Sequence, residues 1–178
     1  MGFSISWVAF QGLPKAEVLA RTRLRDTGHL DEANEAPFSV ADLPMGWVVL
    51  FSNDFSFGSA EHLNGLSTGA TLISCQVHES IMFSATFCSV DGKDVWGVWH
   101  DGQKGGYDLT VSGRTPSQLG AIRDSLHSEQ DRHGGVKSEV DFGFDIPVEL
   151  AAAFTQYRHD RWKFAWGEPR FYVLERTR

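Results

Sequence analysis

The chain has 178 residues, 42% of them hydrophobic and 22% charged, which excludes wholesale disorder and predicts one folded domain over residues 1–178. Its formal net charge of −7 argues against general nucleic-acid binding, which requires a basic surface. No window approaches the run of about eighteen apolar residues that a membrane span requires, so no membrane association is expected.

The first part of the chain alternates strands with short helical segments. Residues 3–10 (FSISWVAF) alternate apolar and polar side chains and predict a strand, and Pro14 then suits the first position of a helix. Residues 26–38 are acidic and rich in turn formers, so they predict an exposed loop of functional or mobile character. The almost wholly apolar residues 46–52 predict a central strand, and Ser59 caps a further short helix.

Residues 70–113 predict a four-stranded antiparallel meander. A three-residue turn would pair Val77 with Phe83, and the two-residue hairpin Asp91-Gly92 would pair Phe87 with Trp96. A four-residue loop at 102–105 would then pair Trp96 with Val111, Val98 with Leu109 and His100 with Tyr107. This register predicts an apolar core face comprising Ile73, Cys75, Val77, Phe83, Ala85, Phe87, Trp96, Val98 and His100.

The C-terminal part predicts two more helices and two more strands. Thr115 to Gln118 has the pattern of a capping box, and the helix that follows ends near Gly134. Residues 138–146 alternate apolar and acidic side chains and predict a half-exposed strand. Pro147 opens another helix, and Phe171 to Leu174 predict a terminal strand.

These elements predict an α+β fold. The meander at about 70–113 is extended by the N-terminal strand, by strands at 46–52 and 138–146, and by the C-terminal strand. Four helices are expected to pack mainly on one face of this sheet, and the two terminal strands are expected to be possible neighbours.

Two cysteines and the N-terminus bear on the compartment. Cys75 and Cys88 are expected on opposite faces of the sheet, so a disulfide between them is not expected. The start MGFSISWVAF has neither the basic residues nor the long apolar run of a secretory signal. The sequence therefore predicts a small acidic protein of the bacterial cytoplasm.

One candidate binding site lies at a rim of the meander. The two turns at 79–81 and 102–105 fall at the same end of the sheet, which brings distant polar residues together. A histidine there can act as a general base, whereas the simpler interpretation is a partly buried His100 that hydrogen-bonds Tyr107. The rim residues, with the exposed face beside them, are His78, Glu79, Trp99, His100, Asp101 and Tyr107.

The rim residues match no motif of known chemistry. The sequence contains no HExxH and no phosphate-loop spacing, so no catalytic residue is assigned and no metal or cofactor is expected. The acidic segment 26–35 is a candidate wall of a cleft, although a solvated loop is the simpler interpretation.

The second candidate site is the C-terminal tail. Residues 158–178 hold six basic and three acidic residues, interleaved with aromatic side chains. Trp, Tyr and Arg supply most of the binding energy at protein interfaces, so the tail predicts a contact surface. Its tentative interaction residues are Arg158, His159, Arg161, Trp162 and Trp166.

Two hypotheses for function follow. The first is a non-enzymatic interaction protein, immunity-like or self-associating, which binds another protein through the tail or through the sheet face around Trp99. The alternative is a small-molecule binder or hydrolase with a His/carboxylate site at the meander rim. A pocket that contains His100 would favour the alternative, and exposed tail tryptophans would favour the first hypothesis.

Overall fold

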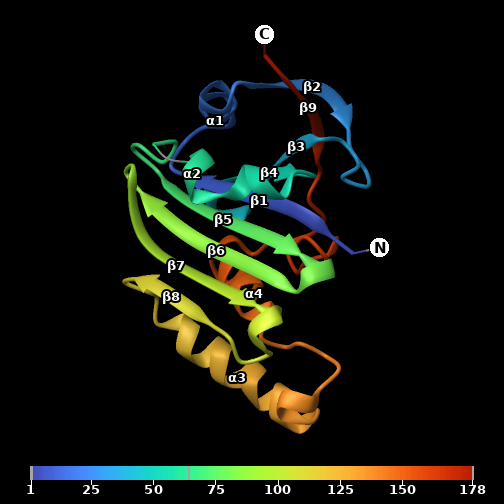
Figure 1. Ribbon diagram of the computed structural model, residues 1–178. Coiled ribbons are helices and arrows are strands. Elements are labelled where there is room, and N and C mark those ends of the chain that lie inside the picture. The colour runs from blue at the N-terminus through green and yellow to red at the C-terminus, as the bar shows by residue number, and fades with distance from the viewer. Residues whose placement is uncertain (1, 64, 178) are drawn as a thin grey trace.

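The computed structural model describes residues 2–63 and 65–177. Within this part of the chain, nine strands form a single antiparallel sheet in the order β2-β9-β3-β4-β1-β5-β6-β7-β8 (Figure 1). The strands are β1 (Ser4–Gln11), β2 (Leu24–Leu30), β3 (Phe38–Asp42), β4 (Trp47–Ser52), β5 (Thr71–His78), β6 (Phe83–Val90), β7 (Lys93–Asp101), β8 (Thr110–Gly113) and β9 (Tyr172–Arg176). The helices are α1 (Lys15–Thr22), α2 (Ala60–Leu63), α3 (Gln118–Arg132) and α4 (Asp145–Thr155).

The predicted α+β architecture and its meander β5-β6-β7-β8 are confirmed. The strand predicted at 46–52 is β4, which lies beside β1 near the middle of the sheet. All six residues of β4 are buried, as expected for a strand covered on both faces. The two terminal strands are not neighbours, because β3 and β4 lie between β9 and β1.

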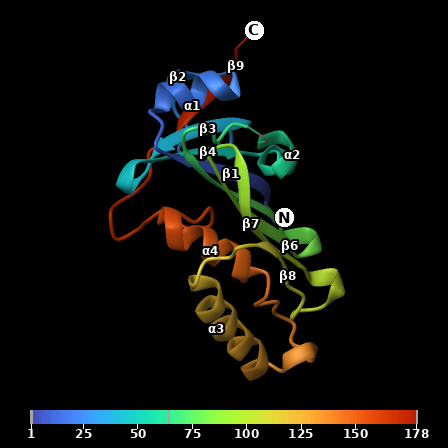
Figure 2. The ribbon, with the colours of Figure 1, turned by 90° about the vertical axis from the view of Figure 1, so that its left-hand side faces the viewer.

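The helices cover both faces of the sheet, so the expectation of four helices mainly on one face is wrong. Figure 2 shows α2 and α4 on opposite sides of the sheet. Val18 and Leu19 of α1 and Leu63 of α2 pack on one core with Leu50 and Leu72. The larger core on the other face contains α4 and the inner side of α3 and includes Trp7, Ile73, Cys75, Trp96, Val98, Ile146 and Leu150.

The side-chain register of β6 differs from the predicted one by one residue. His78, not Val77, pairs with Phe83, because the β5–β6 connection includes Met82 in the left-handed region at φ 50°. The hairpin at Asp91-Gly92 is confirmed, with Val90 paired to Lys93. A bulge then follows, because Cys88 pairs with Trp96 while Ser89 pairs with Asp94.

This shift places the small polar side chains of β6 on the α4 face and its aromatic side chains on the other. Ser84, Thr86 and Cys88 are buried, and the hydroxyl of Ser84 donates to the carbonyl of Phe144 at 2.7 Å. A hydrogen-bonded serine costs little in a core, and its small size lets α4 approach β6 closely. The predicted register of β7 and β8 is also wrong, by two residues, because Val98 pairs with Val111 and Trp96 pairs with Gly113.

Two further expectations are corrected. Residues 138–144 form no strand, because their backbone groups bind side chains: the amide of Phe142 donates to Gln130 at 2.9 Å, and the amide of Phe144 to Asp141 at 3.3 Å. Part of the loop expected at 26–38 is instead strand β2, a polar edge strand that pairs with β9. Its two faces are mostly exposed, so apolar alternation could not reveal it.

None of the helices in the described part of the chain has the length and apolar character that a membrane crossing requires.

The burial of both cysteines leads to the first prediction. Cys75 and Cys88 lie together on the α4 face as free thiols, not on opposite faces as expected, because β6 is shifted by one residue. Burial raises the pKa of Cys75 and raises that of Cys88 to about 11. We expect a thiol reagent such as DTNB at about pH 8 to modify neither cysteine in the native protein, because a reactive thiolate is neither formed nor accessible. Both cysteines should react after unfolding in urea. Rapid modification of one thiol per chain in the native protein would contradict the placement of β6.

Candidate binding cleft

His100, the proposed centre of the rim site, is completely buried and faces the α4 side of the sheet. Its Nδ1 lies 2.7 Å from the backbone carbonyl oxygen of Asp108, and its Nε2 lies 2.9 Å from a carboxylate oxygen of Asp141. Both ring nitrogens therefore face acceptors, which favours the doubly protonated ring. Burial acts to lower the pKa of His100, but the hydrogen bonds and charges of Asp141 and Asp108 outweigh it and raise that pKa above its ordinary value.

The expected hydrogen bond between His100 and Tyr107 does not form between these two described residues. The Tyr107 hydroxyl instead donates to Asp131 on α3, and its ring meets His127 edge-on at 5.1 Å. The hydrogen bond from His100 to Asp141 holds the irregular segment 138–144 against β7. Gly143, which has no side chain, leaves room for the ring of His100. A Cβ atom on Gly143 would lie only 2.9 Å from Nδ1 of His100.

The other rim residues are also engaged in local structure. Glu79 accepts a hydrogen bond from the amide of Phe3 at 2.9 Å, and His78 contacts the Ser80 hydroxyl at 3.0 Å. Asp101 accepts from the amide of Gln103 and pairs with Lys104. The structure brings His78 and Asp101 to either side of Phe83, where the predicted register placed Val77 and His100, and His100 points away from them into the core.

Trp99 lies on the opposite face from His100, where it borders a shallow concavity of about 490 Å³. Phe83, Ala85 and Phe87 of β6 line the same concavity, because the register shift turned them to this side. Asp94 is the only charged residue in its lining within the described part of the chain. Figure 1 shows that this half of the sheet, over β6 and β7, is not covered by α1.

The tail begins with a buried arginine. Arg158 pairs through Nη1 with Glu149 at 2.5 Å, through Nη2 with Asp145 at 2.9 Å and through Nε with Asp160 at 2.8 Å. Burial raises the pKa of Asp145 despite Arg158, whereas at Asp160 the arginine outweighs burial and lowers the pKa. This network fixes the chain just after α4.

His159 follows Arg158 and packs edge-on against Phe3, with ring centroids 5.1 Å apart. Burial, aided by Arg158 and opposed by Asp160, lowers the pKa of His159 to about 4, so the ring is neutral at pH 7. Its Nδ1 is buried and has no hydrogen-bond partner among the described residues.

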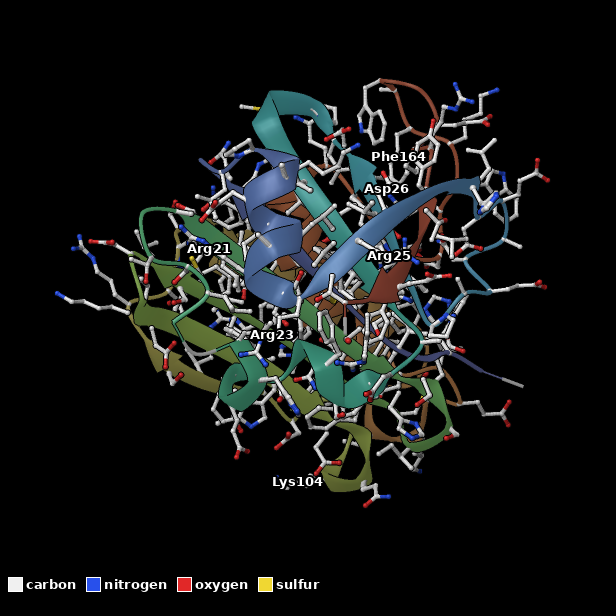
Figure 3. The ribbon with its side chains drawn as sticks, turned by 90° about the horizontal axis from the view of Figure 1, so that it is seen from above. Arg21, Arg23, Arg25, Asp26, Lys104 and Phe164 are labelled. Atoms are coloured by element: carbon white, nitrogen blue, oxygen red, sulfur yellow. The ribbon has the colours of Figure 1, made fainter. Side chains whose placement is uncertain are left out.

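The two tail tryptophans have different environments. Trp166 stacks on Phe164 with a centroid distance of 5.0 Å and donates from Nε1 to the carbonyl of Gln156 at 3.0 Å. Trp162 is 80% exposed. Figure 3 shows Phe164 and Lys104 far apart when the molecule is seen from above, so the tail and the rim loop are separate surfaces.

A large cleft of about 950 Å³ lies between the tail and the β2–β3 connection, and we call it the tail cleft. In Figure 1 the β2–β3 connection, the start of β1 and the segment after α4 all lie toward the right-hand side. The buried rings of Phe51, Tyr157 and Phe171 line the cleft and form its floor. Three exposed apolar side chains lie around it, namely Phe3 at 41%, Leu30 at 47% and Trp162 at 80% exposure.

The two sides of the tail cleft carry opposite charges. The acidic wall consists of Asp31, Glu32 and Glu35 in the β2–β3 connection. The basic wall consists of Arg161 and Arg170 in the tail, where Glu168 opposes part of their charge. Arg161 pairs with Glu149 at 3.3 Å but keeps 55% of its side chain exposed.

The acidic wall is held in place by its own hydrogen bonds. The carboxylate of Asp31 accepts from the amides of Glu35 and Ala36, at 2.9 and 3.3 Å, and the amide of Asp31 donates to the carbonyl of Phe171 at 2.9 Å. The side chain of Asn53 donates to two carbonyls of the same turn. The wall is thus fixed both to β4 and to the strand that continues from the tail.

Sequence reasoning identified the tail residues and the acidic segment separately but missed that they face each other. It also missed Phe3 and Leu30 as exposed members of the site. The pairing that joins the two walls, Leu30 with Tyr172, connects residues far apart in the chain. Only the run of aromatic and apolar residues at 171–174 predicted a strand there.

No protein-family model, no curated protein and no solved structure matches this chain. Among the described residues, no group of three or more His, Cys, Asp or Glu side chains is placed to hold a metal ion.

The buried interaction between His100 and Asp141 predicts that the stability of the fold depends on pH. Because the folded pKa of His100 is raised, its contribution is complete below the ordinary pKa of about 6.5 and is lost as the pH rises through the folded pKa. We expect His100→Gln to reduce the free energy of unfolding by roughly 1–3 kcal/mol near pH 6, with a smaller difference near pH 9. Urea denaturation across this range measures the effect, and the exposed His29→Gln is the control. If the difference in the free energy of unfolding between wild type and His100→Gln does not change with pH, His100 is not a charged partner of Asp141.

The arginine network gives a second prediction on stability. Arg158→Met leaves three carboxylates without their common partner, and we expect a loss of about 3–5 kcal/mol at pH 7. The loss should shrink as the pH falls below the ordinary Asp pKa of about 3.9, because Arg158 holds the folded pKa of Asp160 below that value. Arg161→Met is the matched control and should cost less than about 1 kcal/mol, because its ion pair is exposed. Equal losses in the two variants, measured by urea denaturation, would refute the role given to Arg158.

Proposed function

We propose that this chain is a non-enzymatic interaction protein that binds another protein through the tail cleft. The observation that carries the proposal is the 80% exposure of Trp162 beside a cleft with an aromatic floor. A tryptophan exposed to water forgoes a large burial free energy, which a partner can supply. Trp and Arg are also the residues that most often dominate binding energy at protein interfaces.

The apolar residues around the cleft support the same proposal. Phe3, Leu30 and Trp162 come from three distant parts of the chain and converge on one surface. Single exposed apolar residues are ordinary, but a group of them around a concave aromatic surface is typical of an interaction site. The charged walls then provide the polar rim that surrounds the apolar centre of such interfaces.

The rigidity of the walls favours binding without a large ordering cost. The acidic wall is fixed by the hydrogen bonds of Asp31 and Asn53, and the start of the tail by the ion pairs of Arg158. A surface that is already ordered loses little conformational entropy when a partner binds. The chain therefore presents a preformed site.

The alternative, a small-molecule or hydrolase site at the meander rim, has weaker support. A general base must reach the proton that it removes, and the ring of His100 is 0% exposed with both nitrogens occupied by protein acceptors. His78, Glu79 and Asp101 line none of the cavities described above.

The proposal includes a cytoplasmic setting. Two free, buried cysteines suit a reducing compartment. The net charge of −7 suits a protein partner better than a nucleic acid.

The test is partner capture from the native host with Trp162→Ala as the variant. Removal of a central tryptophan typically costs about 2 kcal/mol or more, so we expect captured partner to fall by about tenfold or more. Val136→Ala is the matched control, because Val136 is 85% exposed and lies outside the tail cleft. Capture is quantified by mass spectrometry and repeated with purified components. Unchanged recovery with Trp162→Ala would remove the proposal.

A further inference from the structure

The tail cleft has a charge pattern that is complementary to itself. One wall carries Glu32 and Glu35, both exposed, together with Asp31. The opposite wall carries Arg161 and Arg170, both exposed. A partner that fills this cleft must present a positive surface to the first wall and a negative surface to the second.

A second copy of the chain meets this requirement without any additional feature. Rotation by 180° about an axis through the middle of the cleft exchanges the two walls. The acidic wall of one copy then faces the basic wall of the other, and this contact occurs twice in the pair. The same rotation brings the two aromatic centres toward each other, so that Trp162 of each copy lies over the cleft of the other.

We propose that the occupant of the tail cleft is a second copy of this chain, bound in a two-fold symmetric dimer. This inference rests on the proposed function, in which the cleft is a protein-binding surface, and it names the partner. The dimer buries Phe3, Leu30 and Trp162 at its centre and pairs Glu32 and Glu35 with Arg161 and Arg170 across the axis. Glu168 belongs to the basic wall and reduces its positive charge, so the contact is not purely electrostatic.

The net charge of −7 explains why such a dimer needs local complementarity. Two copies repel each other at long range, and the opposed walls must overcome this repulsion at short range. Apolar burial at the centre supplies the remaining driving force, and a stable interface of this kind buries at least about 1,000 Å² in total.

The experiment exploits the symmetry through a charge exchange. Arg170→Glu makes both contacts acidic on acidic, and Glu35→Lys makes both contacts basic on basic. A one-to-one mixture of the two variants restores opposite charges. One contact of the mixed pair keeps the original residues, and the other places the introduced glutamate of one copy opposite the introduced lysine of its partner. Both original side chains are exposed, so both variants should fold.

The readout is the molar mass by light scattering or sedimentation at protein concentrations up to about 100 µM. We expect the wild type to move toward twice 19.8 kDa, each variant alone to remain near 19.8 kDa, and the mixture to return to the doubled mass. Trp162→Ala should also remain near the monomer mass. Circular dichroism of each variant confirms that a loss of dimer is not a loss of fold.

Four results would overturn the proposed dimer through the tail cleft: a wild type that stays monomeric, a charge variant that remains dimeric on its own, a mixture of folded charge variants that stays monomeric, or a Trp162→Ala variant that remains dimeric. The first of these leaves the proposed function standing, because capture of a different partner that depends on Trp162 is measured separately. Conversely, a dimer that survives Trp162→Ala removes the inference and leaves the capture result to decide the function of the cleft.

Discussion

The buried guanidinium of Arg158 determines where the segment after α4 lies. Three carboxylates surround it, two from α4 and one from the tail, so the chain cannot leave the helix in another direction without exposing or unpairing a charge in the core. Tyr157 immediately before it packs on Trp7 of the central strand and on Phe171. His159 immediately after it reaches Phe3. One ion-pair network therefore sets the floor of the tail cleft and the start of its basic wall.

The fold class was predictable because its strongest signals are local. Alternation in β5 and β7, the apolar run of β4 and the Asp91-Gly92 hairpin each depend on neighbouring residues, and all are confirmed. The errors arose where a single residue changes the outcome. Met82 in the left-handed region and the bulge beside Cys88 shift β6 by one position, and each face of that strand then carries the opposite set of side chains.

The candidate site was predictable only in pieces. Composition identified the aromatic and basic tail and the acidic segment, because both are biased in sequence. Their meeting depends on β2 and β9, and β2 is a polar edge strand whose burial pattern differs little from that of a loop. The rim shows the converse case. His100 and Asp101 were correctly placed at the end of a strand, but the role of His100 depends on Asp141, which belongs to a segment predicted to be a strand.

The position of β9 between β2 and β3 has a consequence for how the protein is made. Synthesis proceeds from the N-terminus, so β2 and β3 leave the ribosome long before the strand that joins them. Until residues 172–176 emerge, the sheet can extend no further than β3 on this side, and the β2–β3 connection has no neighbour to hold it. The tail cleft is thus completed only after β9 has emerged. A nascent chain with its meander already folded still lacks this cleft, so the association proposed for the cleft has to wait for residues 172–176.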